Sequence, residues 1–445
     1  MLRIKPKLIV LVVFDSLRSD HMSCYGYEKD TTPNLSQLLE TQGVIFENAF
    51  SAASWTLPSA ASILTGVLPS RHSRFRSLRG PWPNKVKQVA SLLSSFGIYT
   101  EAITANNYFV TEKYGFAEGF NKFTSVLTFM DYPRLQRILH VIKTWYRDGM
   151  HQGGPEVVKL FQESVPSHSH QGAFYYLHFN DTHGSFNVPR SFIEKVNNRR
   201  VGLPELLRLQ GDQEKREAAI CRYDGAILFA DQLLTELIDF LRSIDLWNDT
   251  VLILTADHGE AFGEYKDFRG HGTHLCKSLI HIPLILLGPR ILPEARRVSQ
   301  VVQTIDIVPT ILELCGLGWY PPSEPGLWGI SLIETLQNPS PVGHRLAFSE
   351  EWGAGPGSDQ PDRWLRSVTD GQYQVIWEPG CEPEVYDLSS GNIGLSNLWN
   401  ESASKKVRFL LSELVRLGRV GEGTGTEDVE ETEILRRLRD LGYEQ

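Results

Sequence analysis

The chain has 445 residues, of which 41% are hydrophobic and 22% are charged. This composition excludes wholesale disorder, and the length is enough for a large domain with a smaller attachment, because single cores rarely exceed about 300 residues. The net charge of −9, from 44 basic and 53 acidic residues, argues against a nucleic-acid partner. An anionic ligand would therefore need a local source of positive charge.

Five cysteines are scattered along the chain and form no Cys-x-x-Cys pair. We therefore expect neither a disulfide framework nor a structural zinc site. The apolar run 8–14 is too short to cross a bilayer and no small-residue cleavage site follows it, so it predicts a buried strand. We expect no integral membrane segment, and a cytoplasmic location is the default prediction.

Continuous apolar runs rich in β-branched residues predict four buried strands, at 8–14, 173–179, 250–255 and 281–287. Helical spacing lies between them. One helix is predicted at 34–41, with Thr32 as its cap and Pro33 in its first turn, and a long one at 214–244. Strands that alternate with helices indicate an α/β fold with a mostly parallel central sheet flanked by helices.

The rest of the chain is more mixed. Segment 130–222 holds basic, aromatic and Gly/Pro-rich patches around the strand at 173–179, and parts of it are interpreted as lid or loop insertions. A polar linker at 338–342 precedes period-two runs at 364–369 and 373–378, which predict a small antiparallel sheet closed by a helix near 405–417. The predicted units are a metal-dependent catalytic domain (1–337), a small C-terminal α+β subdomain (338–420), and a flexible linker with a terminal helix (421–445).

Polar side chains follow three of the apolar runs directly: Asp15, Asp181 with His183, and Asp257 with His258. Ligands of such sheets bind outside the carboxyl ends of the strands, so these groups should gather at one rim. Asp15 by itself could equally be a helix cap or a partner of Arg18. Two carboxylates and one imidazole, from Asp15, Asp257 and His258, suit one divalent metal ion, and Ca²⁺, Mn²⁺, Mg²⁺ and Zn²⁺ all remain open.

Residues 54–66 contain Pro58 followed by small residues, which predicts a loop leading into a helix with Thr56 near its amino end. Backbone N–H groups and the helix dipole favour an oxyanion at that point. A hydroxyl beside a metal there has a lowered pKa and can attack phosphorus or sulfur. The alternative is that Thr56 or Ser59 is only a helix cap.

His183 and His271 are further candidates for catalysis. A single histidine usually has a structural or surface role. Two histidines near the rim could instead bind the oxygens of a substrate or protonate a leaving group.

Several motifs together resemble the sulfatase family of the alkaline phosphatase superfamily. The first three in chain order are the opening metal motif at 14–26, the nucleophile helix at 56–66 with 68–72, and the second metal motif at 255–260. His271-Gly-Thr follows, where the family often has Lys-Gly-Thr. The last two are a structural motif at 305–312 and the motif of the C-terminal subdomain at 384–388. The resemblance implies an alkaline phosphatase-like fold and a metal-dependent ester hydrolase over most of the chain.

The chain departs from the family at the nucleophile. Thr56 stands where sulfatases have the Cys or Ser of Cys/Ser-x-Pro-x-Arg, and Ala60 stands in place of the arginine, so no formylglycine is expected. Ser16 replaces a second aspartate that many members use as a metal ligand. A threonine nucleophile resembles that of the nucleotide phosphodiesterases and phosphoethanolamine transferases. Because only Asp181-Thr-His183 stands for the Asp-x-x-x-His motif of two-metal members, one metal is expected.

The leading hypothesis is hydrolysis of a small anionic sulfate or phosphate ester, with Thr56 as the metal-activated nucleophile. The alternatives are a phosphodiesterase or phosphotransferase acting on a phosphorylated glycan or lipid head group, and a non-catalytic sulfatase-like protein that binds an anion. The predicted sites are catalytic (Thr56, His183, His271), substrate-binding (Arg18, Asn106, His183, His271) and metal-binding (Asp15, Asp257, His258). Arg18 could also orient the metal-binding carboxylates.

Overall fold

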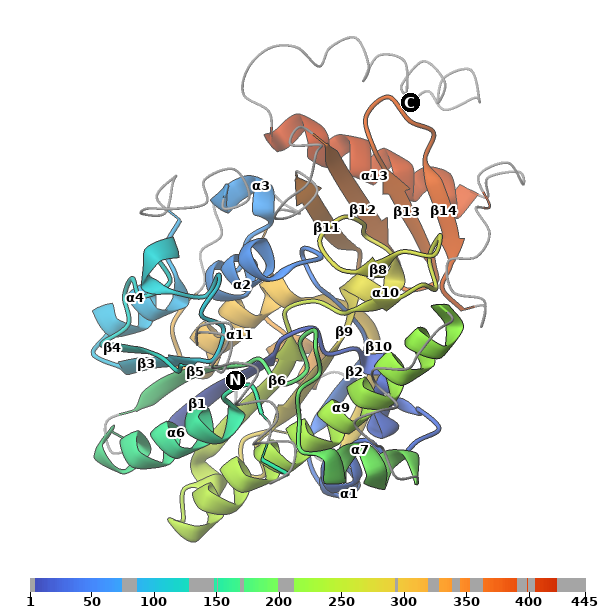
Figure 1. Ribbon diagram of the computed structural model, residues 1–445. Helices are drawn as coiled ribbons and strands as arrows, with labels where there is room; N and C mark the ends of the chain where they lie inside the picture. Colours follow the sequence, from blue (N-terminus) through green and yellow to red (C-terminus); the bar gives the residue numbers. More distant parts are fainter. Residues whose placement is uncertain are drawn as a thin grey trace.

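The central sheet has eight strands, in the order β10-β2-β9-β6-β1-β5-β3-β4 (Figure 1). The computed structural model describes residues 5–73, 86–127, 148–149, 151–168, 172–198, 212–292, 295–318, 328–337, 345–352, 363–389, 398 and 405–421. The strands of the central sheet are β1 (Leu8–Phe14), β2 (Val44–Phe50), β3 (Tyr99–Thr104), β4 (Lys122–Ser125), β5 (Ala173–Phe179), β6 (Thr250–Ala256), β9 (His281–Leu287) and β10 (Arg296–Gln303).

Helices cover both faces of this sheet (Figure 1). The described helices of this part of the chain are α1 (Pro33–Leu39), α2 (Thr56–Thr65), α3 (Pro69–His72), α4 (Val89–Ser95), α6 (Gly154–His168), α7 (Arg190–Asn197), α9 (Asp212–Ser243), α10 (Lys277–Ile280), α11 (Ile307–Leu314) and α12 (Ile333–Gln337). Short 3-10 helices lie at Ser19–His21, Ser23–Tyr25, Glu112–Tyr114, Trp247–Asp249 and Thr304–Asp306. The predicted α/β class is therefore confirmed.

Strand β1 shows why the apolar runs could be recognised. Its seven residues are all buried. Val10 and Val12 join a core cluster that includes residues of α6 and α9, whereas Leu11 and Val13 join one that includes residues of α2 and α11. Because successive side chains of a strand point to opposite faces, a strand covered on both faces must be apolar throughout.

Strand β9 is the exception to the parallel arrangement. It pairs antiparallel with both β2 and β6. Its carboxyl end therefore lies at the opposite edge from the ends of β1 and β6. An apolar run looks the same in either direction, so the sequence did not reveal this orientation.

A second, smaller sheet follows the central one along the chain. It is antiparallel and consists of β11 (Ala347–Trp352), β12 (Trp364–Thr369), β13 (Tyr373–Trp377) and β14 (Glu384–Asp387), with α13 (Lys405–Gly421) packed against it (Figure 1). A two-stranded ribbon, β7 (Ala261–Phe262) with β8 (Arg269–Gly270), lies in the loop after β6. The predicted antiparallel subdomain is thus confirmed. The predicted linker at 338–342 lies outside the described residues, and so does the predicted segment 421–445 except for Gly421, which is the last residue of α13.

Segment 130–222 is more regular than predicted where it is described. It contains α6, β5, α7 and the start of α9. The remaining parts of the proposed lid lie outside the described residues. Within the described part of the chain, no helix is both long and apolar enough to cross a bilayer, and the five cysteines form no disulfide.

The start of α1 shows a cap that the sequence did not reveal. Thr32 precedes the helix as predicted, but its side chain makes no capping hydrogen bond. The carboxylate of Asp231, from α9, instead accepts the backbone N–H groups of Asn34 (3.0 Å) and Leu35 (2.9 Å). Thr32 therefore occupies the predicted N-cap position, but the carboxylate of a residue far along the chain, and not the Thr32 hydroxyl, satisfies these donors.

We expect Asp231→Ala to lower the free energy of unfolding by about 1 kcal/mol, a typical value for losing a helix cap. The reason is that two N–H groups at the start of α1 lose their acceptor. Urea denaturation at pH 7.5 measures the change, and Asp239→Ala, on the exposed surface of the same helix, is the control. An unchanged midpoint in Asp231→Ala would contradict the proposed cap.

Candidate metal centre

The register of the central strands brings two acidic residues together. Phe14 of β1 pairs with Ala256 of β6, so Asp15 and Asp257 leave the sheet at the same level. Both carboxylates are fully buried. The turn after β1 depends on Ser16, whose φ of 63° lies in the left-handed region. Its N–H donates to Asp257 Oδ1 (3.1 Å) and its hydroxyl donates to Asp15 Oδ1 (2.9 Å).

Two imidazoles lie against this pair of carboxylates. His258 Nε2 is 3.5 Å from Asp15 Oδ1 and 3.6 Å from Asp257 Oδ2. His178 Nε2 is 3.5 Å from Asp15 Oδ2 and 3.9 Å from Asp257 Oδ2. His258 Nδ1 lies 2.8 Å from the carbonyl of Gly259. Because a carbonyl only accepts, Nδ1 carries the proton and Nε2 keeps a lone pair for a cation.

His178 was not among the predicted site residues. It lies next to last in β5, inside the apolar run that the sequence analysis interpreted only as a strand. The available signal was a polar residue on a strand that is otherwise buried on both faces, since a buried polar group needs a partner. Its Nδ1 is 2.7 Å from the Tyr176 hydroxyl, which holds the ring in place.

Burial and the neighbouring charges act against each other in this cluster. Burial raises the pKa of Asp15, but the electrostatic interactions with the surrounding imidazoles, that of His183 first, outweigh it and hold this pKa well below its usual range. Burial, and then the charge of Asp15, raise the pKa of Asp257. Burial lowers the pKa of His258, which favours the neutral ring that a metal ligand requires.

The donors fit a divalent cation. One ligand atom each from Asp15, His178 and Asp257 lies within 4.8 Å of the other two. Asp257 Oδ2 and His178 Nε2 are buried and have no hydrogen-bond partner among the described residues. Buried polar atoms without partners are costly, and a cation among these oxygens and nitrogens would satisfy them. The predicted metal residues Asp15, Asp257 and His258 are thus brought together, with His178 added.

Thr56 lies beside this cluster, at the first position of α2. Its Oγ1 is 3.4 Å from Asp15 Oδ2 and 3.3 Å from His258 Nε2. The hydroxyl of Ser59, one turn further along α2, donates to the carbonyl of Asp257, which fixes the helix to that residue. The predicted position of Thr56 near the amino end of a helix agrees with the structure.

His271 and His183 extend the row of imidazoles outward. The His271 ring centroid is 4.5 Å from that of His258 and 5.2 Å from that of His183. Burial alone would lower the pKa of His271, but a 3.0 Å hydrogen bond to Glu260 raises it to about 9. His271 therefore carries positive charge at neutral pH, next to the two buried carboxylates.

Asn106 and Arg18 were both predicted to bind substrate. The amide nitrogen of Asn106 donates to Asp15 Oδ2 (2.8 Å), so it orients a candidate metal ligand. Arg18 is buried and donates to Asp20, Glu264 and the carbonyl of Glu260. Substrate binding by Arg18 stays a prediction, one that these contacts do not favour.

Asp181 was expected to lie at the rim together with His183, but its carboxylate is directed elsewhere. Asp181 Oδ1 accepts the N–H of Gln152 (2.7 Å), immediately before α6. Gln152 in turn donates to the carbonyl of His183 (3.0 Å). Asp181 therefore ties the loop that carries His183 to α6, and is not part of the cluster of candidate metal ligands.

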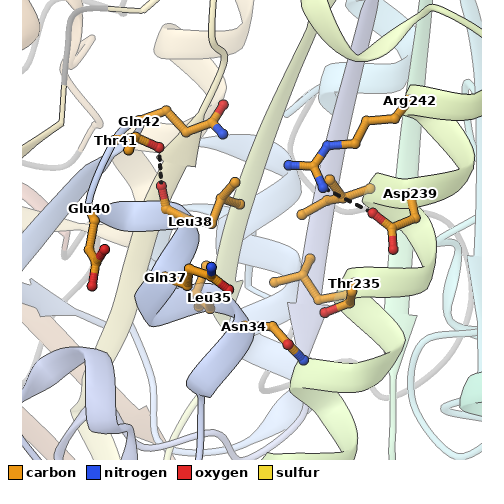
Figure 2. A pocket seen from close by; sticks show the side chains of 12 residues that line it. Asn34, Leu35, Gln37, Leu38, Glu40, Thr41, Gln42, Thr235, Asp239 and Arg242 are labelled. Atoms are coloured by element: carbon orange, nitrogen blue, oxygen red, sulfur yellow. Dashed lines mark hydrogen bonds and ion pairs between the residues drawn. The ribbon is translucent and has the colours of Figure 1, made fainter.

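A cavity of about 430 Å³ lies elsewhere, between α1 and the second half of α9 (Figure 2). Its wall is mostly polar, and Arg242 is paired there with Asp239 at 2.9 Å. None of the candidate metal ligands, nor Thr56, lines it. The cavity is therefore separate from the site described above.

The chain belongs to the sulfatase family, because the family model described as Sulfatase matches residues 7–317. It is 24% identical to arylsulfatase K of Canis lupus familiaris over 73% of this chain and 65% of that protein, so it spans less than two thirds of that relative. It is 24% identical to an arylsulfatase of Clostridium perfringens over 93% of this chain and 94% of that protein. A phosphoethanolamine transferase EptA of Helicobacter pylori is 26% identical over 67% of this chain and 51% of its own length.

Solved structures show the same fold. The structure of BT4656 in complex with its substrate D-glucosamine-2-N,6-O-disulfate has a TM-score of 0.74 at 16% identity, covering 96% of this chain and 99% of that one. The phosphonate monoester hydrolase of Agrobacterium radiobacter has a TM-score of 0.71 at 19% identity, covering 94% and 96%. The fold therefore agrees with the sulfatase and alkaline phosphatase-like architecture that the motifs implied.

We expect the metal-free protein to bind one divalent cation, and the affinity to fall by more than about 10-fold in both His258→Ala and His178→Ala. Each change removes a nitrogen that would bind the metal. Even the loss of a residue that only hydrogen-bonds to a metal ligand lowers metal affinity by roughly 10- to 100-fold. Isothermal titration with Mn²⁺, Ca²⁺ and Zn²⁺ measures the affinity, with His274→Ala, outside the cluster, as control. Full affinity in His178→Ala would remove His178 from the ligand set, and full affinity in Asp257→Ala would contradict the site.

Asp181 should make stability depend on pH. Burial raises its pKa from the usual 3.8 to about 7, so between these values the folded chain keeps a proton that the unfolded chain has released. The contribution of this group to the free energy of unfolding therefore falls as the pH rises from 4 to 7. We expect Asp181→Asn to gain stability relative to the parent protein over this range, measured by urea denaturation without metal. If the difference in the free energy of unfolding between Asp181→Asn and the parent protein does not change with pH, the raised pKa of Asp181 is ruled out.

Proposed function

We propose that the protein is a metal-dependent hydrolase of sulfate or phosphate esters that uses Thr56 as its nucleophile. The observation that carries this proposal is the position of the Thr56 hydroxyl, 3.4 Å from Asp15 and 3.3 Å from His258, at the amino end of α2. Membership of the sulfatase family supports ester hydrolysis as the reaction class. Thr56 and Ala60, where sulfatases have a modified residue and an arginine, support a hydroxyl nucleophile without formylglycine.

Asp15, Asp257, His258 and His178 would hold the cation. When bound there, a divalent ion supplies positive charge that lowers the pKa of a nearby hydroxyl and offsets the charge of an anionic ester. The backbone N–H groups of Thr56 and Leu57, the first two residues of α2, would bind a non-bridging oxygen of the ester, because the first N–H groups of a helix have no partner within it. The local positive charge that an acidic protein needs for an anionic substrate would thus come from this site.

The reaction would proceed in two steps. The Thr56 hydroxyl gives its proton to solvent water, and Oγ1 forms a bond to phosphorus or sulfur while the bond to the leaving oxygen breaks. His271, which is positively charged at neutral pH, or His183 beside it would give a proton to that oxygen. Water then attacks the same atom and gives a proton to the histidine that was left neutral by the first step. The bond from Oγ1 to phosphorus or sulfur breaks, Oγ1 regains a proton from solvent, and the inorganic ion is released.

A second candidate is a phosphodiesterase or phosphotransferase that acts on a phosphorylated glycan or lipid head group. The similarity to a phosphoethanolamine transferase and the likeness in fold to a phosphonate monoester hydrolase support it. The same Thr56 would attack, with an alcohol in place of water as the final acceptor in a transferase. A panel of nitrophenyl sulfate, nitrophenyl phosphate and a nitrophenyl phosphodiester separates these activities.

We expect Thr56→Ala to lower kcat on the preferred ester by at least about 1,000-fold, because loss of a nucleophile leaves only binding and electrostatic effects. Thr56→Ser keeps a hydroxyl and should retain part of the activity. Metal affinity and thermal unfolding are measured alongside, and both should stay close to those of the parent protein. Undiminished turnover by Thr56→Ala would refute the nucleophile, and a protein that binds metal but turns over none of the esters would favour an anion-binding role.

A further inference from the structure

A carboxyl group of the small C-terminal sheet reaches the loop that precedes α2. Glu351 of β11 is buried, and its Oε2 accepts the hydroxyl of Ser54 at 2.5 Å. Ser54 is two residues before Thr56 and is itself fully buried. The contact joins two parts of the chain separated by 297 positions. It links β11 to the loop that ends at Thr56, the proposed nucleophile.

Ser54 also connects to the loop that carries His271. The carbonyl of Ser54 accepts the N–H of Gly272 at 3.0 Å. Gly272 has a φ of 86°, which favours glycine, and it directly follows His271. One residue, Ser54, therefore links Glu351 to both the start of α2 and the outer imidazoles.

The side chain of Glu351 is uncharged at neutral pH, unlike a glutamate exposed to water. Burial raises its pKa to about 8, so the side chain is neutral at pH 7. A neutral carboxyl binds Ser54 without adding a third negative charge near Asp15 and Asp257, where an anionic ester would be repelled.

The neighbouring contacts of β11 help to fix the same loop. The N–H of Glu350 donates to the carbonyl of Ala52 (2.9 Å), and the Ser349 hydroxyl donates to that of Ser51 (2.6 Å). The side chain of Glu350 faces elsewhere: it accepts the N–H of Ser70 (2.7 Å) and lies 3.3 Å from Arg366. Glu350 is therefore a matched control, an adjacent buried acid that does not reach Ser54.

We propose that Glu351 is a positioning residue of the active site, which sets the place of the Thr56 hydroxyl and of the His271 loop through its hydrogen bond to Ser54. The small C-terminal sheet then contributes a residue that positions the active site. This inference rests on the proposed function, in which Thr56 is the nucleophile. Misplacing a reacting group by about 1 Å can cost on the order of 100-fold in rate.

The test compares Glu351→Ala, Glu351→Gln and Glu350→Gln in the full-length protein loaded with metal. We expect Glu351→Ala to lower kcat by roughly 10- to 100-fold, with KM changed less than about threefold and metal affinity unchanged. Glu351→Gln should recover most of kcat, because a neutral amide oxygen still accepts from Ser54. Glu350→Gln should lower the melting temperature without changing kcat.

Ser54→Ala provides a second approach in case Glu351→Ala does not fold. It should lower kcat as Glu351→Ala does, and the double variant should lose no more, because both changes remove the same hydrogen bond. The inference is overturned if Glu351→Gln fails to restore kcat, if Glu350→Gln loses as much kcat as Glu351→Ala, or if the losses from Ser54→Ala and Glu351→Ala are additive. A wrong nucleophile assignment can be distinguished from a wrong role for Glu351, because in that case Thr56→Ala would keep full turnover.

Discussion

The site depends on two carboxylates that are buried side by side. Asp15 and Asp257 leave β1 and β6 at the same level, and neither is exposed to water. Two adjacent negative charges in a region of low dielectric repel each other strongly, so the surroundings must offset them. The N–H of Ser16, the amide of Asn106 and the flanking imidazoles do so in part. The remaining unpaired atoms, Asp257 Oδ2 and His178 Nε2, are ones that a divalent cation would satisfy.

Much of this arrangement could be predicted from the sequence. Strands buried on both faces consist of apolar residues throughout, so β1, β5 and β6 stand out. Most of the polar residues after them lie at one rim, but the carboxylate of Asp181 is directed toward the N–H of Gln152. Asp15, Asp257 and His258 were found in this way. His178 was missed because it lies inside such a run. The cap of α1 was missed because Asp231 comes from a distant helix, and no local pattern reveals which donors a remote carboxylate will satisfy.

The same limit applies to the small C-terminal sheet. Alternating residues predicted its strands, but the target of each side chain depends on how the two sheets pack together. Glu350 and Glu351 are adjacent and identical in type, yet one pairs with an arginine and the other reaches the loop before α2. The contacts of Arg18 also could not be read from the sequence: this residue, three positions after the candidate metal ligand Asp15, donates to two acids and a carbonyl.

The reversed direction of β9 has a consequence for how the family can vary. Because β9 runs against β6, the chain enters it at the rim, and the carbonyls of Leu279 and Ile280 just before it accept the N–H groups of Gly259 and Ser51. Changes in chain length between β8 and α10 thus fall at the mouth of the site. Changes after Leu287 fall at the far edge. The connection between β8 and α10 can therefore change in length near the candidate site while β1 and β6 keep the register that brings Asp15 and Asp257 together.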